Sequence, residues 1–165
     1  MTFYEFFAGG GMVRAGLGAH WRCLFANDVS PQKARIYRRN WGGDALVLAD
    51  IAALTSADFP DVPDLVWGSF PCQDLSVAGA GAGLAGQRSG SFWSLIGVLH
   101  DLKDQGRAPP LIVLENVLGT LSANGGADFT ALCQAVAELG YDLGAGRDAE
   151  QCHGAVGGAQ SGRSP

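Results

Sequence analysis

The sequence has few charged residues, few cysteines and no long apolar run. Charged residues make up 16% of its 165 residues and hydrophobic residues 47%, a balance typical of a folded domain rather than a disordered chain. No apolar run approaches the roughly 20 residues of a membrane-spanning helix, and no signal-peptide pattern is present. We therefore expect one cytoplasmic domain without a membrane partner. The cysteines are far apart, fit neither a disulfide framework nor a zinc site, and indicate a reducing compartment: Cys23, Cys72, Cys133 and Cys152.

The sequence also lacks an excess of basic residues. Its formal net charge is −5 and its pI about 5.0, whereas a protein that binds duplex DNA by itself usually has a basic surface. Either nucleic acid is not the partner, or the basic surface belongs to something missing from this chain.

Short apolar runs alternate with segments of helical spacing. This alternation predicts an α/β fold with a doubly wound, mostly parallel sheet that ends after about its fifth or sixth strand and leaves an open edge there. Ser30 and Pro31 have the residue types of a helix start, and Gly106 and Gly140 those of helix ends. The expected strands are 2–7, 22–26, 45–48, 64–68 and 111–114, and the expected helices begin near 12, 31, 92 and 129.

The pattern is lost after Leu143. Residues 144–165 have neither helical nor alternating spacing, which predicts an irregular tail after a body of residues 1–143. Arg outnumbers Lys 9 to 2, as expected of GC-rich DNA, and such DNA read out of frame gives Gly-, Ala- and Arg-rich strings. Our hypothesis is that the reading frame is lost near residue 145; a frayed terminus is the alternative.

Several candidate binding residues directly follow expected strands, where open α/β sheets bind their ligands. The glycines of 9–11 would let a nucleotide cofactor approach the backbone, although the run is not the dinucleotide fingerprint. Asp28 could accept hydrogen bonds from a ribose, or could cap the helix that follows. Asp50 and Ile51 would suit an adenine ring, although a simple turn explains them equally well.

Cys72 is the candidate nucleophile. A buried cysteine is usually only a small apolar side chain, but this one follows Pro71 on a loop and precedes Gln73. Glu115 ends the next expected strand, and a partly buried carboxyl there could supply a proton. The alternative for Glu115 and Asn116 is a turn after a strand.

Taken together and in this order, these motifs resemble the N-terminal catalytic part of a DNA cytosine-5 methyltransferase, as found in restriction–modification systems. The resemblance covers residues 2 to about 143. Two acidic residues differ from the usual family pattern. Glu5 stands where many relatives have Asp, and Asp28 stands where they have the other acidic residue, Glu. The matching segments are Glu5–Gly11 with Gly16–Leu17, Asn27–Asp28, Asp50–Ile51, Gly68–Gln73, Arg88–Gly90 and Glu115–Val117.

The resemblance implies a Rossmann-like domain that uses S-adenosyl-L-methionine. Cys72 would attack carbon 6 of a cytosine swung out of DNA, and Glu115 would bind ring nitrogen 3. Gln73, Arg88 and Asn116 would serve substrate binding. The implied cofactor residues are Phe7, Gly9, Gly10, Gly11, Asp28, Asp50, Ile51 and Pro71.

The resemblance also implies that the target-recognition region and a late cofactor motif are absent from the 165 residues. DNA would then be bound, at the nucleoid, through regions outside this chain. We expect a truncated enzyme that is inactive alone. The alternatives are one subunit of a split enzyme completed by a C-terminal chain, and a fragment that binds S-adenosylmethionine or a partner without catalysis. RNA cytosine is a further substrate that the shared motifs allow.

Overall fold

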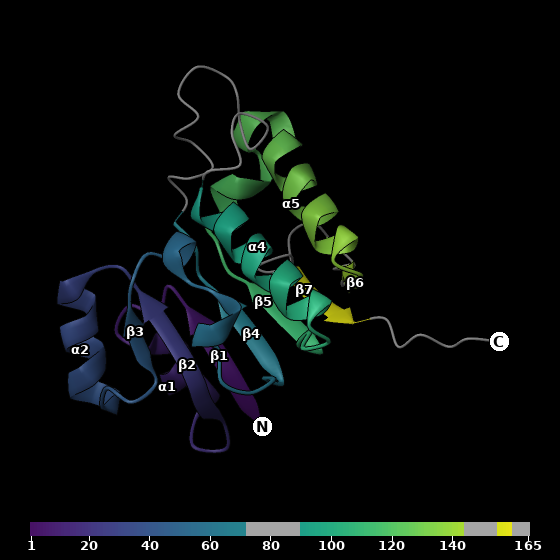
Figure 1. The fold of residues 1–165 in the computed structure, drawn as a ribbon. Coiled ribbons are helices and arrows are strands. Elements are labelled where there is room, and N and C mark those ends of the chain that lie inside the picture. Colours follow the sequence, from purple (N-terminus) through teal and green to yellow (C-terminus); the bar gives the residue numbers. More distant parts are fainter. Residues whose placement is uncertain (72–89, 144–154, 160–165) are drawn as a thin grey trace.

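The computed structural model describes residues 1–71, 90–143 and 155–159, which form a central sheet with helices on both faces (Figure 1). Five strands are parallel, and a short antiparallel pair continues the sheet, in the order β3-β2-β1-β4-β5-β7-β6. The predicted α/β, mostly parallel fold is confirmed. The strands are β1 Thr2–Phe6, β2 Arg22–Asp28, β3 Leu46–Leu48, β4 Leu65–Gly68, β5 Leu111–Leu114, β6 Tyr141–Leu143 and β7 Ala155–Ala159.

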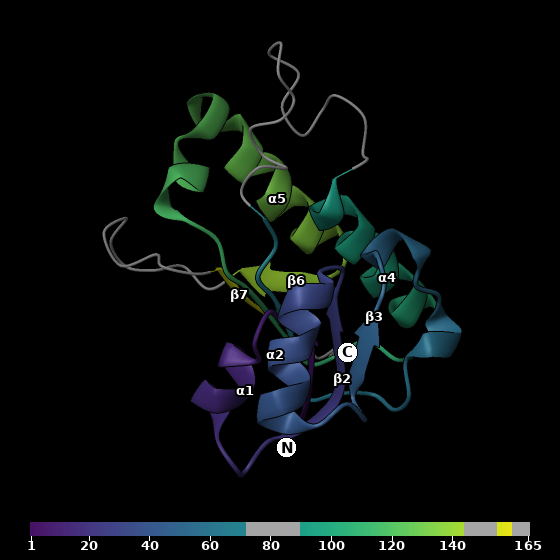
Figure 2. The ribbon, with the colours of Figure 1, turned by 90° about the vertical axis from the view of Figure 1, so that its left-hand side faces the viewer.

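The helices form two layers, one on each face of the sheet. In Figure 2, α1 and α2 lie on one side of the strands and α4 on the other. No helix in the described part of the chain is long and apolar enough to cross a membrane. The α-helices are α1 Met12–Leu17, α2 Pro31–Trp41, α4 Ser91–Asp104 and α5 Ala127–Glu138, and short 3-10 turns cover Ile51–Ala53, Ser56–Asp58, Leu118–Leu121 and Ala123–Gly126.

Alternation along the strands builds two apolar cores. In β1, Phe3 packs with the layer of α1 and α2, whereas Tyr4 and Phe6 pack with the layer of α4 and α5. The same division holds in β5, where Val113 joins the first core and Ile112 the second. Successive side chains of a strand point to opposite faces. The continuous apolar runs in the sequence are therefore strands covered on both sides.

The predicted helix ends are confirmed. The Ser30 hydroxyl accepts a hydrogen bond from the Lys33 amide at 3.4 Å, and Pro31 is the first residue of α2. Gly106 and Gly140 follow α4 and α5 with φ of +69° and +88°, a conformation that favours glycine.

The last two strands differ from the prediction. β6 was not expected, and within the segment predicted to be irregular, residues 155–159 form β7. β7 pairs antiparallel with β5 and β6. The expectation of an open edge at the fifth strand is therefore wrong, because β5 has a partner on each side. The remainder of 144–165 lies outside the described residues.

Gly68, the last residue of β4, gives a test of the packing between the sheet and α4. A methyl group there would lie 2.6 Å from Leu95 Cδ2 and 3.4 Å from Leu114 Cδ2, and Leu95 is fully buried. We expect Gly68→Ala to lower the free energy of unfolding by about 1–3 kcal/mol, the usual cost of overpacking a core. Urea denaturation measures this.

The matched control is Gly97→Ala in α4, where an added methyl group meets nothing within 4 Å. Because glycine disfavours a helix interior, this change should raise stability by about 0.5–1 kcal/mol. Equal effects of the two substitutions would contradict the packing described here.

Candidate functional site

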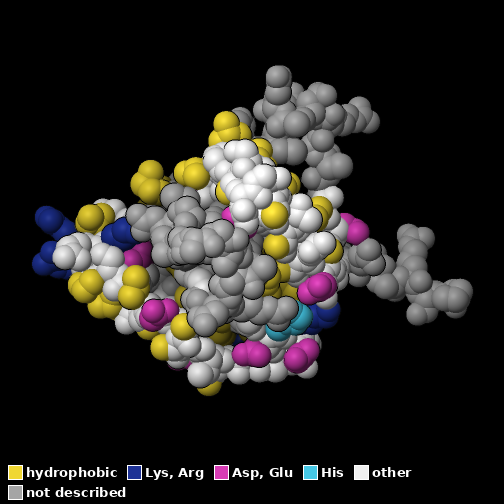
Figure 3. All heavy atoms as spheres, turned by 90° about the horizontal axis from the view of Figure 1, so that it is seen from above, with side chains coloured by type: hydrophobic (Ala, Val, Ile, Leu, Met, Phe, Trp, Pro, Cys, Tyr) yellow, Lys and Arg dark blue, Asp and Glu magenta, His cyan; other side chains and the backbone are white. Residues whose placement is uncertain are grey.

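The five parallel strands end at one edge of the sheet. Phe6 pairs with Asn27 and with Gly68, Asp28 with Leu48, and Gly68 with Leu114. The residues that follow these strands therefore meet along that edge, as predicted. Figure 3 looks down on it; the largest group of Lys and Arg side chains in that view lies over α2, which carries Lys33, Arg35, Arg38 and Arg39.

The glycine turn begins with a strained residue. Phe7, expected as the last residue of the first strand, instead leaves β1 with φ of +59°. For a residue with a side chain this left-handed conformation costs roughly 1–2 kcal/mol, and such outliers cluster at functional sites. Gly9 and Gly11 also have positive φ, and the Gly11 amide closes the turn on the Ala8 carbonyl at 2.8 Å. A Cβ on Gly9 would meet no atom of the described residues within 4 Å, so this side of the turn is open toward the described part of the chain.

Asp28 joins the turn to the end of β2. The Gly9 amide donates to one of its carboxylate oxygens at 2.9 Å and the Ser30 amide to the other at 2.8 Å. The carboxylate is buried, with 3% of the residue exposed, and Lys33 Nζ lies 4.0 Å away. Asp28 therefore holds the chain just before α2, while the N-cap of that helix is Ser30. Asp28 also has lone pairs left, since each carboxylate oxygen can accept a second bond.

Asp50 and Ile51 lie at the end of β3. Asp50 is exposed and accepts a hydrogen bond from the Ala52 amide at 2.9 Å, as a turn residue would. Ile51 is 4% exposed and belongs to the apolar core. Asp50 thus has its carboxylate near solvent, while most of the Ile51 side chain is covered.

Asn116 fixes the start of the loop after β4. Its amide nitrogen donates to the Phe70 carbonyl at 3.0 Å, and its oxygen accepts from the Val117 amide at 2.8 Å and the Thr120 hydroxyl at 2.9 Å. The buried Phe70 ring also packs on Phe92 of α4, with the ring centroids 5.1 Å apart. The backbone just before Pro71 is therefore held from two directions.

The predicted catalytic residues are only partly within the described residues. Pro71 is exposed, and Glu115, also exposed, donates its amide to the Gly68 carbonyl at 3.0 Å. Cys72, Gln73 and Arg88 lie outside the described residues, so the pairing of Cys72 with Glu115 stays a prediction.

Glu5 is a buried carboxyl in β1, two residues before the turn, and from the sequence it was identified only as part of the glycine-turn motif. One oxygen accepts a hydrogen bond from the Val13 amide at 3.2 Å, and the other has no partner among the described residues. The residue is 1% exposed. Burial raises its pKa from the ordinary 4.5 to about 7, against smaller opposing effects of the Val13 amide and of Arg14.

Two further residues near the turn were missed as candidates. Asn40 and Trp41, at the end of α2, both donate hydrogen bonds to the Gly10 carbonyl at 3.1 Å. In the sequence, Trp41 stands at helical spacing from Ala34 and Tyr37, a pattern typical of a packed helix face. No sequence signal could have shown a contact 30 residues away along the chain.

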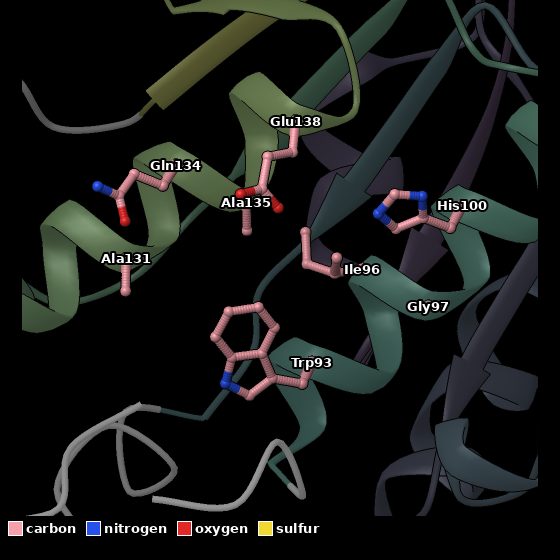
Figure 4. A pocket seen from close by; sticks show the side chains of 8 residues that line it. All are labelled: Trp93, Ile96, Gly97, His100, Ala131, Gln134, Ala135 and Glu138. Carbon is pink, nitrogen blue, oxygen red and sulfur yellow. The ribbon is translucent and has the colours of Figure 1, made fainter. Parts of the chain in front are cut away.

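A separate hollow of about 390 Å³ lies between α4 and α5 (Figure 4). None of the predicted site residues within the described part of the chain lines it. It is therefore a gap between two neighbouring helices of one layer, away from the glycine turn. Its walls are Trp93, Ile96, Gly97, His100, Ala131, Gln134, Ala135 and Glu138.

The raised pKa of Glu5 predicts a pH dependence of stability. The unfolded chain releases this proton near pH 4.5 and the folded chain near pH 7. Its contribution to stability is therefore fully present below pH 4.5 and is lost as the pH rises through 7. Glu5→Gln, which cannot ionise, should lose less stability than the wild type between pH 4.5 and 7. Denaturant unfolding at pH 4.5, 6, 7 and 8 measures this, and parallel pH profiles would contradict it.

Comparison with known proteins gives a consistent picture. The family model for C-5 cytosine-specific DNA methylase matches residues 1–145. The chain is 29% identical over 144 residues to the Type II methyltransferase M.BsuFI of Bacillus subtilis, covering 87% of this chain and 33% of that relative. It is 33% identical over 145 residues to the Type II methyltransferase M2.BsuMI of Bacillus subtilis strain 168, covering 86% and 35%. The chain thus spans about a third of the length of these relatives.

Among solved structures, the S. pombe Dnmt2 methyltransferase has a TM-score of 0.61 and 25% identity, covering 87% of this chain and 41% of its own. With a family model matching 145 of 165 residues, the chain belongs to the C-5 cytosine-specific DNA methylase family.

Proposed function

We propose that this chain carries the cofactor site and the nucleophile of an enzyme that methylates carbon 5 of cytosine in DNA. The observation that carries the proposal is the hydrogen bond from Gly9 to Asp28 beside the open side of the glycine turn. It joins two motifs of the family in one place. Asp50, Pro71 and Glu115 follow β3, β4 and β5 at the same edge of the sheet.

The residues present fit S-adenosyl-L-methionine. The open side of Gly9 leaves room for a ligand against the backbone. Asp28 would accept ribose hydroxyls with its remaining lone pairs, and Asp50 would accept from the adenine amine. Phe7, Gly10, Gly11, Ile51 and Pro71 complete the proposed cofactor residues. When bound, this cofactor supplies an electrophilic methyl group.

The chain's own residues would activate the cytosine. The Cys72 thiolate adds to carbon 6, and Glu115 donates a proton or hydrogen bond to nitrogen 3, so that electron density moves to carbon 5. Carbon 5 would then take the methyl group that the bound cofactor supplies. A base removes the carbon-5 proton, the electron pair left behind expels the Cys72 thiolate, and nitrogen 3 returns any proton that it took to Glu115.

Asn116 would support this chemistry indirectly, by holding the backbone. By holding the Phe70 carbonyl, it fixes the backbone two residues before Cys72. Gln73 and Arg88 are proposed to contact the target nucleotide and a phosphate. DNA recognition would come from a further chain or segment, since the net charge of these 165 residues is −5.

Cofactor binding is tested by filling the open side of the turn. Gly9→Ala places a methyl group in the space proposed for the ligand, and we expect at least a tenfold weaker affinity for S-adenosylmethionine in calorimetry. Gly106→Ala is the matched control: φ is +69° there and +57° at Gly9, and neither methyl group would meet an atom within 4 Å. Both variants should lose about 1 kcal/mol of stability, and only Gly9→Ala should lose affinity.

If the wild-type chain takes up no S-adenosylmethionine, the cofactor assignment is wrong. Equal affinities of Gly9→Ala and Gly106→Ala would place the ligand elsewhere.

Catalysis is tested by covalent trapping on DNA that contains 5-fluorocytosine, with S-adenosylmethionine present. After methyl transfer, fluorine at carbon 5 blocks the final elimination, so the Cys72 adduct should persist. We expect no adduct with Cys72→Ser, and with Glu115→Gln a rate lower by about 10² or more, the usual contribution of a general acid. Denaturing gels of the adduct give both results.

The same assay separates the alternatives when the C-terminal remainder of a Type II relative is supplied as a second chain. An adduct formed only with that chain supports a split or truncated enzyme, and an adduct formed by the 165 residues alone shows that they suffice. No adduct in either case, with cofactor binding intact, would leave a non-catalytic binding fragment and refute the catalytic proposal.

A further inference from the structure

The Gly10 carbonyl is held by two donors from the last turn of α2. Asn40 Nδ2 and Trp41 Nε1 each lie 3.1 Å from this oxygen. A carbonyl oxygen has two lone pairs, so both bonds can form together. Neither donor follows a strand, and neither belongs to the residues proposed above for cofactor or substrate.

The indole of Trp41 also lies directly against the next residue of the turn. A Cβ on Gly11 would fall 2.2 Å from Trp41 Nε1 and 2.5 Å from Cδ1, so only glycine permits this approach. The Arg14 guanidinium lies over the Trp41 ring, 5.1 Å from its centroid, and donates to the buried Tyr37 hydroxyl at 3.2 Å. Tyr37 is fully buried. The indole therefore has contacts on the turn, on α1 and, through Arg14, on the core.

We propose that Asn40 and Trp41 are positioning residues for the cofactor, a role that rests on the function proposed above. Their two hydrogen bonds fix the peptide between Gly10 and Gly11 with its oxygen toward α2. The turn then keeps one conformation, with the Gly9 side open, before any ligand arrives. Ordering a loop in advance lowers the cost of binding.

The two donors should substitute for one another in part. Asn40→Ala removes one donor at an exposed position, and Trp41→Phe removes the other while leaving an aromatic ring beside Gly11. Either variant keeps one hydrogen bond to Gly10. We expect each single change to weaken S-adenosylmethionine binding about threefold, and the double variant to weaken it by well over tenfold, because groups that share a partner are not additive.

Calorimetric titration of the 165-residue chain with S-adenosylmethionine gives these affinities. Trp21→Phe is the matched control, since Trp21 packs on Phe3 in the same core and is not a donor to the turn. It makes the same chemical change and should keep wild-type affinity. A general loss of packing would weaken binding in Trp21→Phe and Trp41→Phe alike and would overturn the proposal.

Hydrogen exchange without cofactor tests the positioning itself. Amides of residues 8–14 should exchange faster in the double variant than in the wild type, while those of β5 should be unchanged. If these amides of the double variant exchange at the wild-type rate, the proposal is refuted, whatever the affinity of that variant for S-adenosylmethionine. If the double variant does not fold, unchanged exchange and affinity within twofold in both single variants would refute it equally.

The exchange measurement also separates this proposal from the function on which it rests. If the wild-type chain does not bind S-adenosylmethionine, the cofactor assignment fails. Faster exchange in the double variant would then still show that Asn40 and Trp41 hold the turn.

Discussion

The parallel pairing of β1 with β2 and β4 is the constraint on which the site depends. The register of β1 on β2 shifts once, between Phe3 and Tyr4, and is regular from there to Phe6. Phe6 faces Asn27 on one side and Gly68 on the other. The chain leaves all three strands at the same level, so Phe7, Asp28 and Ser69 start from one edge. A change in register of one residue would turn every side chain of a strand to the opposite face. The two apolar cores on opposite faces hold the register in place.

Hydrogen bonds from polar side chains then join the segments that leave this edge. Asp28 ties the glycine turn to β2, Asn40 and Trp41 tie it to α2, and Asn116 ties the loop after β4 to β5. Each bond joins residues 19 to 46 positions apart. Loops that would otherwise move are thereby fixed by hydrogen bonds worth about 1 kcal/mol each.

The same edge also contains the least favourable features of the fold. Phe7 has a left-handed backbone, and Glu5 is a buried carboxyl with one oxygen unpaired among the described residues. Both lie within or directly before the turn. Strain and a buried carboxyl of this kind persist only when the surrounding structure holds them in place. Here the aromatic and aliphatic side chains packed on both faces of β1 do so.

Local sequence signals were enough to predict the elements and their order. Apolar runs of four to six residues separated by helical spacing predicted the five parallel strands, and Ser30, Pro31, Gly106 and Gly140 marked helix ends, because these signals act over a few neighbouring residues. The motifs also indicated the family and the edge of the sheet at which its residues gather. Other features could be established only from the folded chain: the two hydrogen bonds of Asp28, the covered position of Ile51, the contacts of Asn40 and Trp41 with Gly10, and the addition of β6 and β7. Those features depend on contacts between residues far apart in the chain, which local periodicity does not encode.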